Sequence, residues 1–284
     1  MGIIVTGATG KLGRLVVEQL LEKVPAEQVT AVVRSAGKAA DLAERGARIA
    51  VADYNAPETF DGLFAAGDKV LLISGNEVAH DRVAQHRVVI DAAKAAGVAL
   101  LAYTSAPGTL SAALADDHRG TEEALRDSGV PYVLLRNGWY HENYTENLAP
   151  VLAHHAVVAA AGEGRVSSAS RADYAAAAVA VLTGEGHANT TYELGGDVAW
   201  SFAEYAAELS RQTGETIAYR RVTVEELTGI LTGAGIPEPV AAVLAGVDTS
   251  IEKGELVVDS GDLSRLIGRP TTPLAEAVAA ALAN

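Results

Sequence analysis

Short segments rich in Val and Ile alternate with longer segments of helical periodicity through the first 137 residues of this chain. Parallel strands need a crossover connection, and a helix is the usual one, so this alternation predicts a parallel sheet covered by helices on both faces. The predicted strands are 3–6, 29–34, 47–52, 69–74, 98–104 and 131–136. The predicted fold is therefore α/β, a Rossmann-type doubly wound parallel sheet with a smaller C-terminal substrate-binding region.

Beyond Gly138 the alternation becomes less regular, which indicates where one region ends and another begins. The helices predicted on either side of this point are 11–23, 81–96 (ending at Gly97, a natural C-cap), 142–154 and 173–182, with a further strand at 191–194. We therefore expect a nucleotide-binding domain over 1–137, completed by about 170–198, and a substrate-binding region over 138–169 and 199–284.

Composition excludes several classes of partner and site. The chain has 22 basic and 36 acidic residues, and its net charge of −14 repels nucleic acid and anionic lipid surfaces. It has no cysteine, which removes disulfides, thiolate catalysis and most structural zinc sites. No segment reaches about 18 uninterrupted apolar residues, and the N-terminus lacks the pattern of a secretion signal. We therefore expect a cytoplasmic protein without membrane insertion.

A glycine-rich turn follows the first predicted strand and leads into the first predicted helix, reading TGATGKLG from Thr6 to Gly13. Gly7 and Gly10 allow a tight turn and a close approach of pyrophosphate to the backbone, and Gly13 lets helix and strand pack closely. The N–H groups and the dipole at a helix N-terminus favour an anion. The G-x-x-G-x-x-G spacing departs from G-x-G-x-x-G, but the order of strand, turn and helix predicts a dinucleotide site.

The residue after the second predicted strand indicates which dinucleotide binds. NAD sites of this type usually have an acidic residue there, which binds the ribose 2′-OH. This chain has Arg34, whose guanidinium can pair with a 2′-phosphate, and Lys11 adds a second positive charge. The alternative is that Arg34 is an ordinary surface residue at a strand end. We predict NADPH as the cofactor.

Two further segments are expected at the carboxyl edge of the sheet, where open α/β folds bind ligands. Ser74, Gly75 and Asn76 follow the fourth strand and suit contacts with ribose and diphosphate, although this is also an ordinary turn sequence. After the sixth strand, the segment 137–144 combines aromatic rings with amides in a chain that has only 5% aromatic residues. That concentration suggests a planar ligand.

With these residues identified, the chain resembles the NmrA-like branch of the atypical short-chain dehydrogenases over nearly its whole length. The resemblance is carried by GATGKLG at 7–13, VVRS at 32–35, ADY at 52–54, LLIS at 71–74, QHRVVIDAAKAAGV at 85–98 and AYTS at 102–105. Its later part is more specific and consists of SGVPYVLLRNGWYHENY, SASRADYAAAA, YELGGDVAWS and LSRLIGRPTTPLAE, in that order.

The resemblance implies bound NADPH and direct hydride transfer to a quinone. The implied cofactor-binding residues are Gly7, Ala8, Thr9, Gly10, Lys11, Leu12, Arg34, Ser74, Gly75, Asn76, Asn137, Gly138, Trp139, Tyr140, His141 and Glu142. Our hypothesis for the walls of the substrate pocket is Tyr103, Trp139, Tyr140 and Asn143, with Ser105 nearby.

The acid–base pair of ketone-reducing short-chain dehydrogenases is missing from this sequence. Those enzymes use Tyr-x-x-x-Lys, whereas the corresponding helix here reads HRGTE from His118 to Glu122. His118 and Ser105 are the candidates for a catalytic group, and the alternative for His118 is a surface histidine. A quinone needs an acid less, because the hydroquinone anion has a phenol-like pKa of about 10 and can take its proton from water.

No metal site is predicted. His141 and Glu142 begin like a zinc-protease H-E-x-x-H motif, but Thr145 stands where the second histidine belongs. The adjacent His154 and His155 would point about 100° apart on a helix.

Two other functions fit the same residues. One is a non-catalytic NADP(H)-binding redox sensor of the NmrA type, and the other is a reductase or isomerase of another small conjugated carbonyl compound. The apolar stripe of 81–96 either forms a homodimer or faces the sheet.

Overall fold

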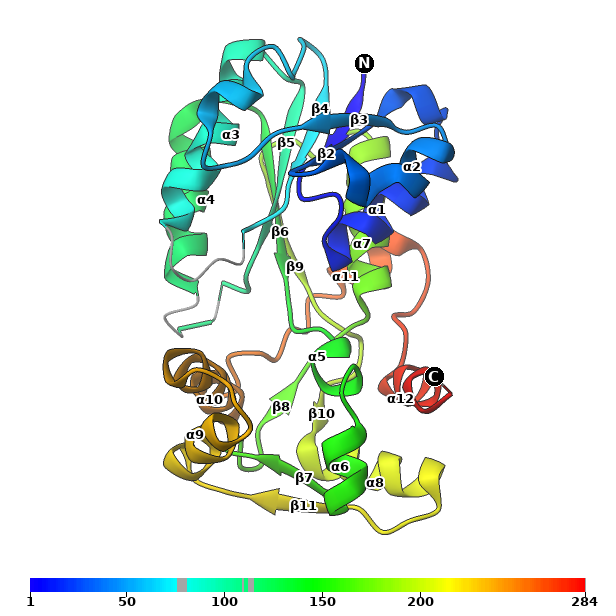
Figure 1. Cartoon of the computed structure of the whole chain (residues 1–284), viewed down its shortest axis with the longest axis vertical. Coiled ribbons are helices and arrows are strands. Elements are labelled where there is room, and N and C mark those ends of the chain that lie inside the picture. The colour runs from blue at the N-terminus through cyan, green and yellow to red at the C-terminus, as the bar shows by residue number, and fades with distance from the viewer. Residues whose placement is uncertain (76–80, 109, 112–114, 284) are drawn as a thin grey trace. The chain divides into compact units, whose positions relative to one another are not determined.

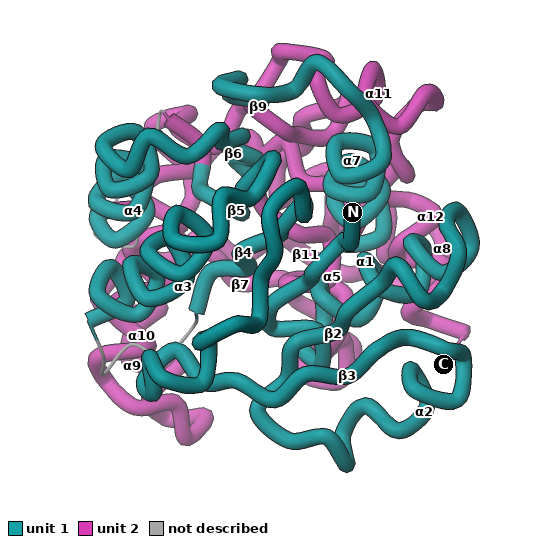
Figure 2. The backbone as a smooth tube through the Cα atoms, turned by 90° about the horizontal axis from the view of Figure 1, so that it is seen from above, with its two compact units in different colours: residues 1–106, 116–137, 171–192 teal, residues 107–115, 138–170, 193–284 magenta. Residues whose placement is uncertain are grey.

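The structure is a computed structural model in which residues 1–75, 81–108, 110–111 and 115–283 are described (Figure 1). They form two compact units, coloured separately in Figure 2. Unit 1 comprises Met1–Ala106, Asp116–Asn137 and Arg171–Tyr192, and unit 2 comprises Pro107–Ala115, Gly138–Ser170 and Glu193–Asn284. Residues 107–115 thus cluster with unit 2, although the sequence pattern places them in the nucleotide-binding domain. Which unit binds cofactor and which binds substrate stays a prediction.

Unit 1 is built on a seven-stranded sheet in the order β3-β2-β1-β4-β5-β6-β9. Its strands are β1 (Ile3–Val5), β2 (Val29–Val33), β3 (Arg48–Val51), β4 (Lys69–Leu72), β5 (Leu100–Ser105), β6 (Tyr132–Asn137) and β9 (Thr190–Leu194). The neighbouring pairs from β3 to β6 are all parallel, and Ile4 lies between Thr30 and Val70. The predicted Rossmann-type fold is therefore confirmed.

Helices cover both faces of this sheet, as Figure 1 shows. They are α1 (Lys11–Leu21), α2 (Ala40–Glu44), α3 (Arg82–Ala96), α4 (Asp116–Ser128) and α7 (Arg171–Thr183), with short 3₁₀ turns η1 (Ala26–Gln28), η2 (Ala36–Ala39) and η3 (Pro57–Phe60). On one face α1 packs against α7, and on the other α3 packs against α4. Because both faces are covered, central strands such as β4 are buried along their whole length, which explains their Val and Leu content.

Helix α3 agrees closely with its prediction. The Asp81 side chain caps its N-terminus by accepting a hydrogen bond from the Ala84 N–H, and Gly97 ends it in the left-handed conformation with φ of 67°. Its apolar residues Val89 and Ile90 belong to the buried core beside the sheet. The apolar stripe therefore faces the sheet, and the alternative of a dimer surface on this stripe is removed.

Unit 2 contains two short sheets and several helices. Its elements are α5 (Glu142–Thr145), α6 (Ala149–His154), β7 (Ala156–Ala159), β8 (Arg165–Val166), β10 (Trp200–Ser201), α8 (Phe202–Thr213), β11 (Ala218–Arg221), α9 (Val224–Gly233), α10 (Glu238–Glu252), α11 (Asp262–Ile267) and α12 (Leu274–Leu282). The single predicted helix over 142–154 is wrong, because two short helices lie there. Pro150 is the cause, since it has no N–H for a continuing helix and restricts the residue before it.

An aromatic cluster fills part of the core of unit 2. The ring of Tyr144 lies 5.0 Å from Trp200 and 5.4 Å from Phe202, measured between ring centroids, and both contacts are edge-to-face. The hydroxyl of Tyr205 donates a hydrogen bond to the Tyr144 carbonyl. Tyr144 thus belongs to the packing of unit 2, although its segment was singled out for a planar ligand.

The described part of the chain has neither a membrane-spanning helix nor a metal-binding cluster. None of its helices is long and apolar enough to cross a membrane. Nor do its His, Asp and Glu side chains gather in groups of three that could hold a metal ion.

The core of unit 2 also buries a carboxylate. Asp248 on α10 is only 9% exposed, and it accepts a hydrogen bond of 2.7 Å from the Ala160 N–H. Burial raises the pKa of Asp248 to about 6. Because this pKa lies above the unfolded value, the folded state holds the proton more tightly, and stability is lost as the pH rises through about 6.

Replacing Asp248 by Asn should therefore stabilise the protein above pH 6. The amide is neutral and still accepts the Ala160 N–H bond. We expect Asp248→Asn to raise the unfolding free energy at pH 8 by on the order of 2–3 kcal/mol, with the gain vanishing near pH 4. Denaturant unfolding across this range measures it, with the exposed Asp259→Asn as the control. A gain that does not change with pH would contradict the prediction.

Candidate functional site

The turn from β1 into α1 has a shape that depends on its glycines. Gly7 has φ of 61°, which side-chain-bearing residues rarely adopt. A Cβ atom on Gly13 would lie 2.3 Å from the Gly7 carbonyl oxygen, so only glycine permits this approach of helix to loop. Gly10 is the N-cap of α1 and provides no side chain to cap the helix. The N-terminus of α1 is therefore suited to an anion, as the sequence predicts.

Side chains connect this glycine turn to the loop after β4. The Thr6 hydroxyl lies 2.5 Å from the Tyr54 hydroxyl and accepts a 3.1 Å hydrogen bond from the Ile73 N–H. Tyr54 in turn donates to the Ile73 carbonyl at 2.9 Å, and burial raises the pKa of its phenol, which stays neutral. The two loops are thus held together at the point where the strand order reverses, between β1 and β4. Sequence reasoning missed this role of Tyr54, which only its position after β3 hints at.

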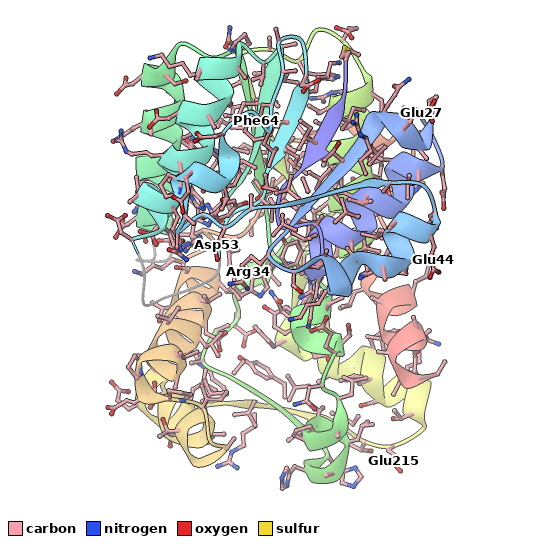
Figure 3. The ribbon with its side chains drawn as sticks, turned by 45° about the horizontal axis from the view of Figure 1, so that its top comes forward. Glu27, Arg34, Glu44, Asp53, Phe64 and Glu215 are labelled. Atoms are coloured by element: carbon pink, nitrogen blue, oxygen red, sulfur yellow. The ribbon has the colours of Figure 1, made fainter. Side chains whose placement is uncertain are left out.

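The predicted positive residues lie at the same edge. Arg34 follows β2 directly and is exposed, and Lys11 is the exposed first residue of α1. Figure 3 labels Arg34 together with Asp53, which follows the neighbouring strand β3. The structure thus places Arg34 and the glycine turn at the carboxyl ends of adjacent strands. That they read a 2′-phosphate stays a prediction.

Ser74 and Gly75, which follow β4, are fixed by hydrogen bonds to the protein. The Ser74 N–H donates to the Thr104 hydroxyl at 2.9 Å, and the Gly75 N–H donates to His86 Nε2 at 3.0 Å. The Ser74 hydroxyl oxygen accepts a 2.7 Å bond from Arg82 Nη2. Asn76, the third residue predicted here, lies outside the described residues.

A polar network behind this loop determines the protonation of two histidines. Arg82 also donates to His118 Nε2 at 3.2 Å, so the proton of His118 is on Nδ1, which lies 2.9 Å from the Tyr103 hydroxyl. Likewise His86 accepts at Nε2, so its Nδ1 donates to Thr121 Oγ1 at 2.8 Å. Burial and the positive charge of Arg82 lower the pKa of His118 to about 4 and that of His86 to about 3. Both imidazoles are neutral at pH 7.

This network corrects the two catalytic candidates. His118 is neither a surface histidine nor an acid at neutral pH, because it has no imidazolium proton to give there. The buried Ser105 hydroxyl donates to Glu122 at 2.6 Å, and Glu122 is also bound by Arg136. Burial raises the pKa of Glu122, but the bonds from Arg136 and Ser105 outweigh it and leave that pKa below its usual range. At neutral pH, therefore, His118 is uncharged and the Ser105 hydroxyl is bonded to Glu122.

The predicted substrate wall also needs correction at Tyr103. Its side chain has 0% exposure, and its ring packs against His86 and His118 in the core of unit 1. A side chain without exposed surface cannot line an open pocket, so Tyr103 supports the network instead. Trp139 and Tyr140 are half-buried and Asn143 is exposed, so these three residues keep surface for a ligand.

Asn137 is the last residue of β6, and its buried side-chain oxygen lacks a hydrogen-bond donor within the described residues. The residue is 7% exposed, and its Oδ1 has no hydrogen-bond partner within the described part of the chain. Leaving a buried amide oxygen without a donor costs about 1–3 kcal/mol. An N–H group of a bound ligand at the carboxyl end of β6 would remove that cost, which fits the predicted cofactor role of Asn137.

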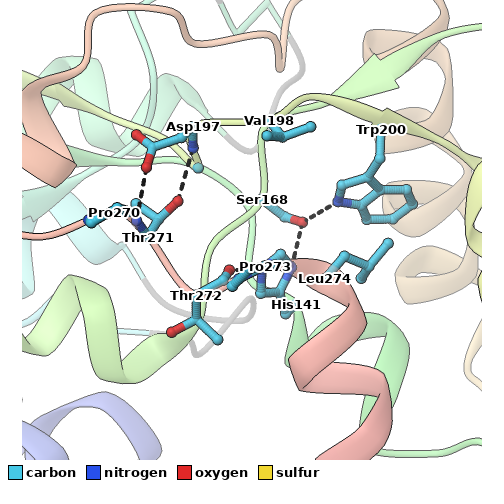
Figure 4. Close-up of a pocket in the computed structure, with 11 residues that line it drawn as sticks. His141, Ser168, Asp197, Val198, Trp200, Pro270, Thr271, Thr272, Pro273 and Leu274 are labelled. Carbon is cyan, nitrogen blue, oxygen red and sulfur yellow. Dashed lines mark hydrogen bonds between the residues drawn. The ribbon is translucent and has the colours of Figure 1, made fainter.

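The predicted segment continues into unit 2, where His141 has a structural role. This residue is 2% exposed, its Nδ1 lies 2.8 Å from Ser168 Oγ, and its Nε2 lies 2.9 Å from the Thr272 carbonyl oxygen (Figure 4). Since a carbonyl only accepts, Nε2 donates to Thr272 and Nδ1 accepts from Ser168. Both ring nitrogens are therefore occupied by the protein, and the predicted cofactor contact of the His141 side chain is not supported.

A pocket of about 260 Å³ lies beside His141 within unit 2. Apolar side chains line much of it, among them Val198, Trp200 and Leu274 (Figure 4). The Thr271 N–H donates to the Asp197 carboxylate at 2.8 Å, so this polar pair on the wall is internally bonded. Nothing in the sequence pattern indicated this pocket.

Comparisons with known proteins support a nucleotide-binding role. A family model described as NAD(P)H-binding matches residues 7–185. Quinone oxidoreductase 2 of Escherichia coli is 46% identical over 278 residues, which cover 97% of each chain. The crystal structure of the NADPH-dependent quinone oxidoreductase QOR2 from E. coli with NADPH superimposes with a TM-score of 0.95 over 99% of this chain and 100% of that chain, at 46% identity. The Citrobacter sp. triphenylmethane reductase complexed with NADP(H) gives a TM-score of 0.94 at 42% identity, over 99% and 100% of the two chains.

Because burial holds His86 and His118 in the neutral form, we predict that the stability of unit 1 falls in acid. Their unfolded pKa is 6.5, well above the folded values of about 4 and 3, so their contribution is complete above pH 6.5 and lost as the pH falls. At pH 5 we expect a loss on the order of 2 kcal/mol for each histidine. Denaturant unfolding at pH 7.5 and pH 5 should show His118→Gln to be less acid-sensitive than wild type.

The matched control is His154→Gln, which replaces an exposed histidine of α6. If His118→Gln kept the full acid sensitivity of the wild type, the assigned neutral state of His118 would be wrong.

Proposed function

This chain belongs to the NAD(P)H-binding family, and on that premise we propose that it is an NADPH-dependent reductase whose hydride acceptor is a quinone. The observation that carries the proposal is the similarity to the E. coli quinone oxidoreductase along the full length of both chains. The location that we propose is the cytoplasm, since a chain without cysteine needs no oxidising compartment. The buried stripe of α3 does not provide a dimer surface, and a homodimer stays a prediction.

The residues at the carboxyl edge of unit 1 fit this cofactor. The glycine turn and the N-terminus of α1 would bind the diphosphate, and Arg34 with Lys11 would bind the 2′-phosphate. The unpartnered Oδ1 of Asn137 would accept a hydrogen bond from an amide N–H. When bound, NADPH supplies the hydride.

The lack of a proton-donating side chain among the described residues favours a quinone as the hydride acceptor. Its described side chains supply no acid in place of Tyr-x-x-x-Lys, because His118 is neutral and the Ser105 hydroxyl is bonded to Glu122. A quinone tolerates this, since its reduced anion is stabilised by the aromatic ring and takes a proton from water. The task left to Trp139, Tyr140 and Asn143 is to hold a flat acceptor in place, which is catalysis by positioning.

NADPH oxidation with a simple benzoquinone tests the proposal. We expect turnover that favours NADPH over NADH, and we expect Arg34→Ala to reduce that preference by about 10- to 100-fold, the value of charge-assisted hydrogen bonds to a phosphate. The nicotinamide absorbance measures the rate after subtraction of the reaction without enzyme. Arg87→Ala, which removes an exposed arginine of α3, is the control for net charge.

Two outcomes would redirect the interpretation. Tight NADPH binding without turnover on any quinone would favour the non-catalytic redox sensor. Turnover with equal use of NADH and NADPH would leave the reductase but remove Arg34 as the reader of the 2′-phosphate.

The proposed pocket wall has its own test. Trp139→Ala should lower kcat/KM for the quinone about tenfold, because an aromatic stacking partner is lost, and Asn143→Ala should lower it in the same direction. The matched control is Asn147→Ala, an exposed asparagine four residues further along the chain. If both pocket variants kept wild-type quinone turnover and NADPH affinity, the assignment of this wall would be wrong.

A further inference from the structure

Arg82 is a buried cation outside the residues that the sequence pattern singles out. It lies in the first turn of α3 and is only 7% exposed. Its guanidinium donates to Ser74 Oγ and to His118 Nε2, and it pairs with Asp117 at 3.3 Å. Its Nε is buried and has no hydrogen-bond partner within the described residues.

Stability alone does not account for this burial. Removing a guanidinium from water costs several kcal/mol, and an ion pair offsets that cost only with good geometry and a full set of hydrogen bonds. Among the described residues its carboxylate partner is Asp117, whose side chain is 42% exposed, and the other two partners are neutral. The Nε–H group of Arg82 also has no acceptor within the described residues. A buried cation held this incompletely indicates a functional role.

The position of Ser74 suggests what that role is. Ser74 follows β4, next to β1 and its glycine turn, at the reversal of strand order where open α/β sheets bind ligands. Ser74 is partly exposed, whereas Arg82 is not, so the cation acts on a ligand through the serine. Because Arg82 donates to Ser74 Oγ, the hydroxyl hydrogen of Ser74 points elsewhere, and it now reaches the Gly75 carbonyl at 3.2 Å. A ribose or phosphate oxygen would accept that hydrogen in place of the Gly75 carbonyl.

We propose that Arg82 is a positioning residue for the cofactor, which fixes the Ser74 hydroxyl at the carboxyl end of β4 and adds a buried positive charge behind the loop. The inference rests on the proposed binding of NADPH, an anion that a chain of net charge −14 otherwise repels. His118 contributes as the neutral acceptor that orients the guanidinium. Ketone reductases have their acid–base pair on the corresponding helix, whereas in this chain His118 on that helix accepts a hydrogen bond from Arg82.

Binding of NADPH to the enzyme without quinone tests this role, followed by nicotinamide fluorescence. We expect Arg82→Gln to raise the Kd about 10- to 100-fold, Arg82→Lys to raise it less because the charge is kept, and Ser74→Ala to raise it severalfold. Since Ser74 acts together with Arg82, Ser74→Ala combined with Arg82→Gln should be no weaker than Arg82→Gln alone. In steady-state turnover the larger change should be a rise in KM for NADPH and the smaller one a fall in kcat.

Controls and alternative outcomes separate positioning from structural support. Arg87→Ala removes an exposed arginine from the same helix and should leave the Kd unchanged. A folded Arg82→Gln with wild-type Kd would overturn the proposal, and so would a loss of kcat with no change in Kd. Should Arg82→Gln fail to fold, an unchanged Kd in both Ser74→Ala and Arg82→Lys would overturn it equally.

The proposed function fails in a different way from this inference. If the wild type binds NADPH but reduces no quinone, the quinone proposal falls and the role of Arg82 is still tested by the Kd values. If the wild type does not bind NADPH at all, both proposals are overturned.

Discussion

The approach of α1 to the loop after β1 is the contact on which the candidate site depends. Gly13 lies so close to the Gly7 carbonyl that no other residue fits, and this closeness brings the N-terminus of α1 to the edge of the sheet. The reversal of strand order between β1 and β4 opens the sheet at the same point. Tyr54 then joins the loops of both strands through Thr6 and Ile73. Within unit 1, Arg34 follows β2 and Ser74 follows β4, the strands on either side of β1.

The architecture of unit 1 could be predicted from sequence because the spacing of apolar residues reflects which residues are buried. Strands of a parallel sheet are buried on both faces, so they appear in the sequence as segments rich in Val and Ile. The break at Pro150 was missed because helical periodicity continues across it, although proline removes a hydrogen-bond donor. Side-chain networks were beyond prediction for a different reason. Arg82, His86 and His118 are ordinary polar residues in the sequence, and only the fold reveals how far they are buried and that both histidines are neutral.

The structure shows which residues replace the missing Tyr-x-x-x-Lys pair and what they bind. Its helix position is occupied by side chains that bind other protein groups: His118 accepts from Arg82, and Glu122 binds Ser105 and Arg136. These residues thus stabilise the loops and strands beside the proposed cofactor instead of exchanging protons with a substrate. A site whose described residues offer no charged acid favours acceptors whose reduced form is stable as an anion, and quinones meet that condition.

The absence of cysteine matters chemically if the substrate is a quinone. Quinones are electrophiles that add covalently to thiolates, and cysteine is the strongest such nucleophile among protein side chains. This chain offers no thiol, and its single methionine is the exposed Met1 at the N-terminus. A reductase of this composition presents no thiol that its own substrate could arylate.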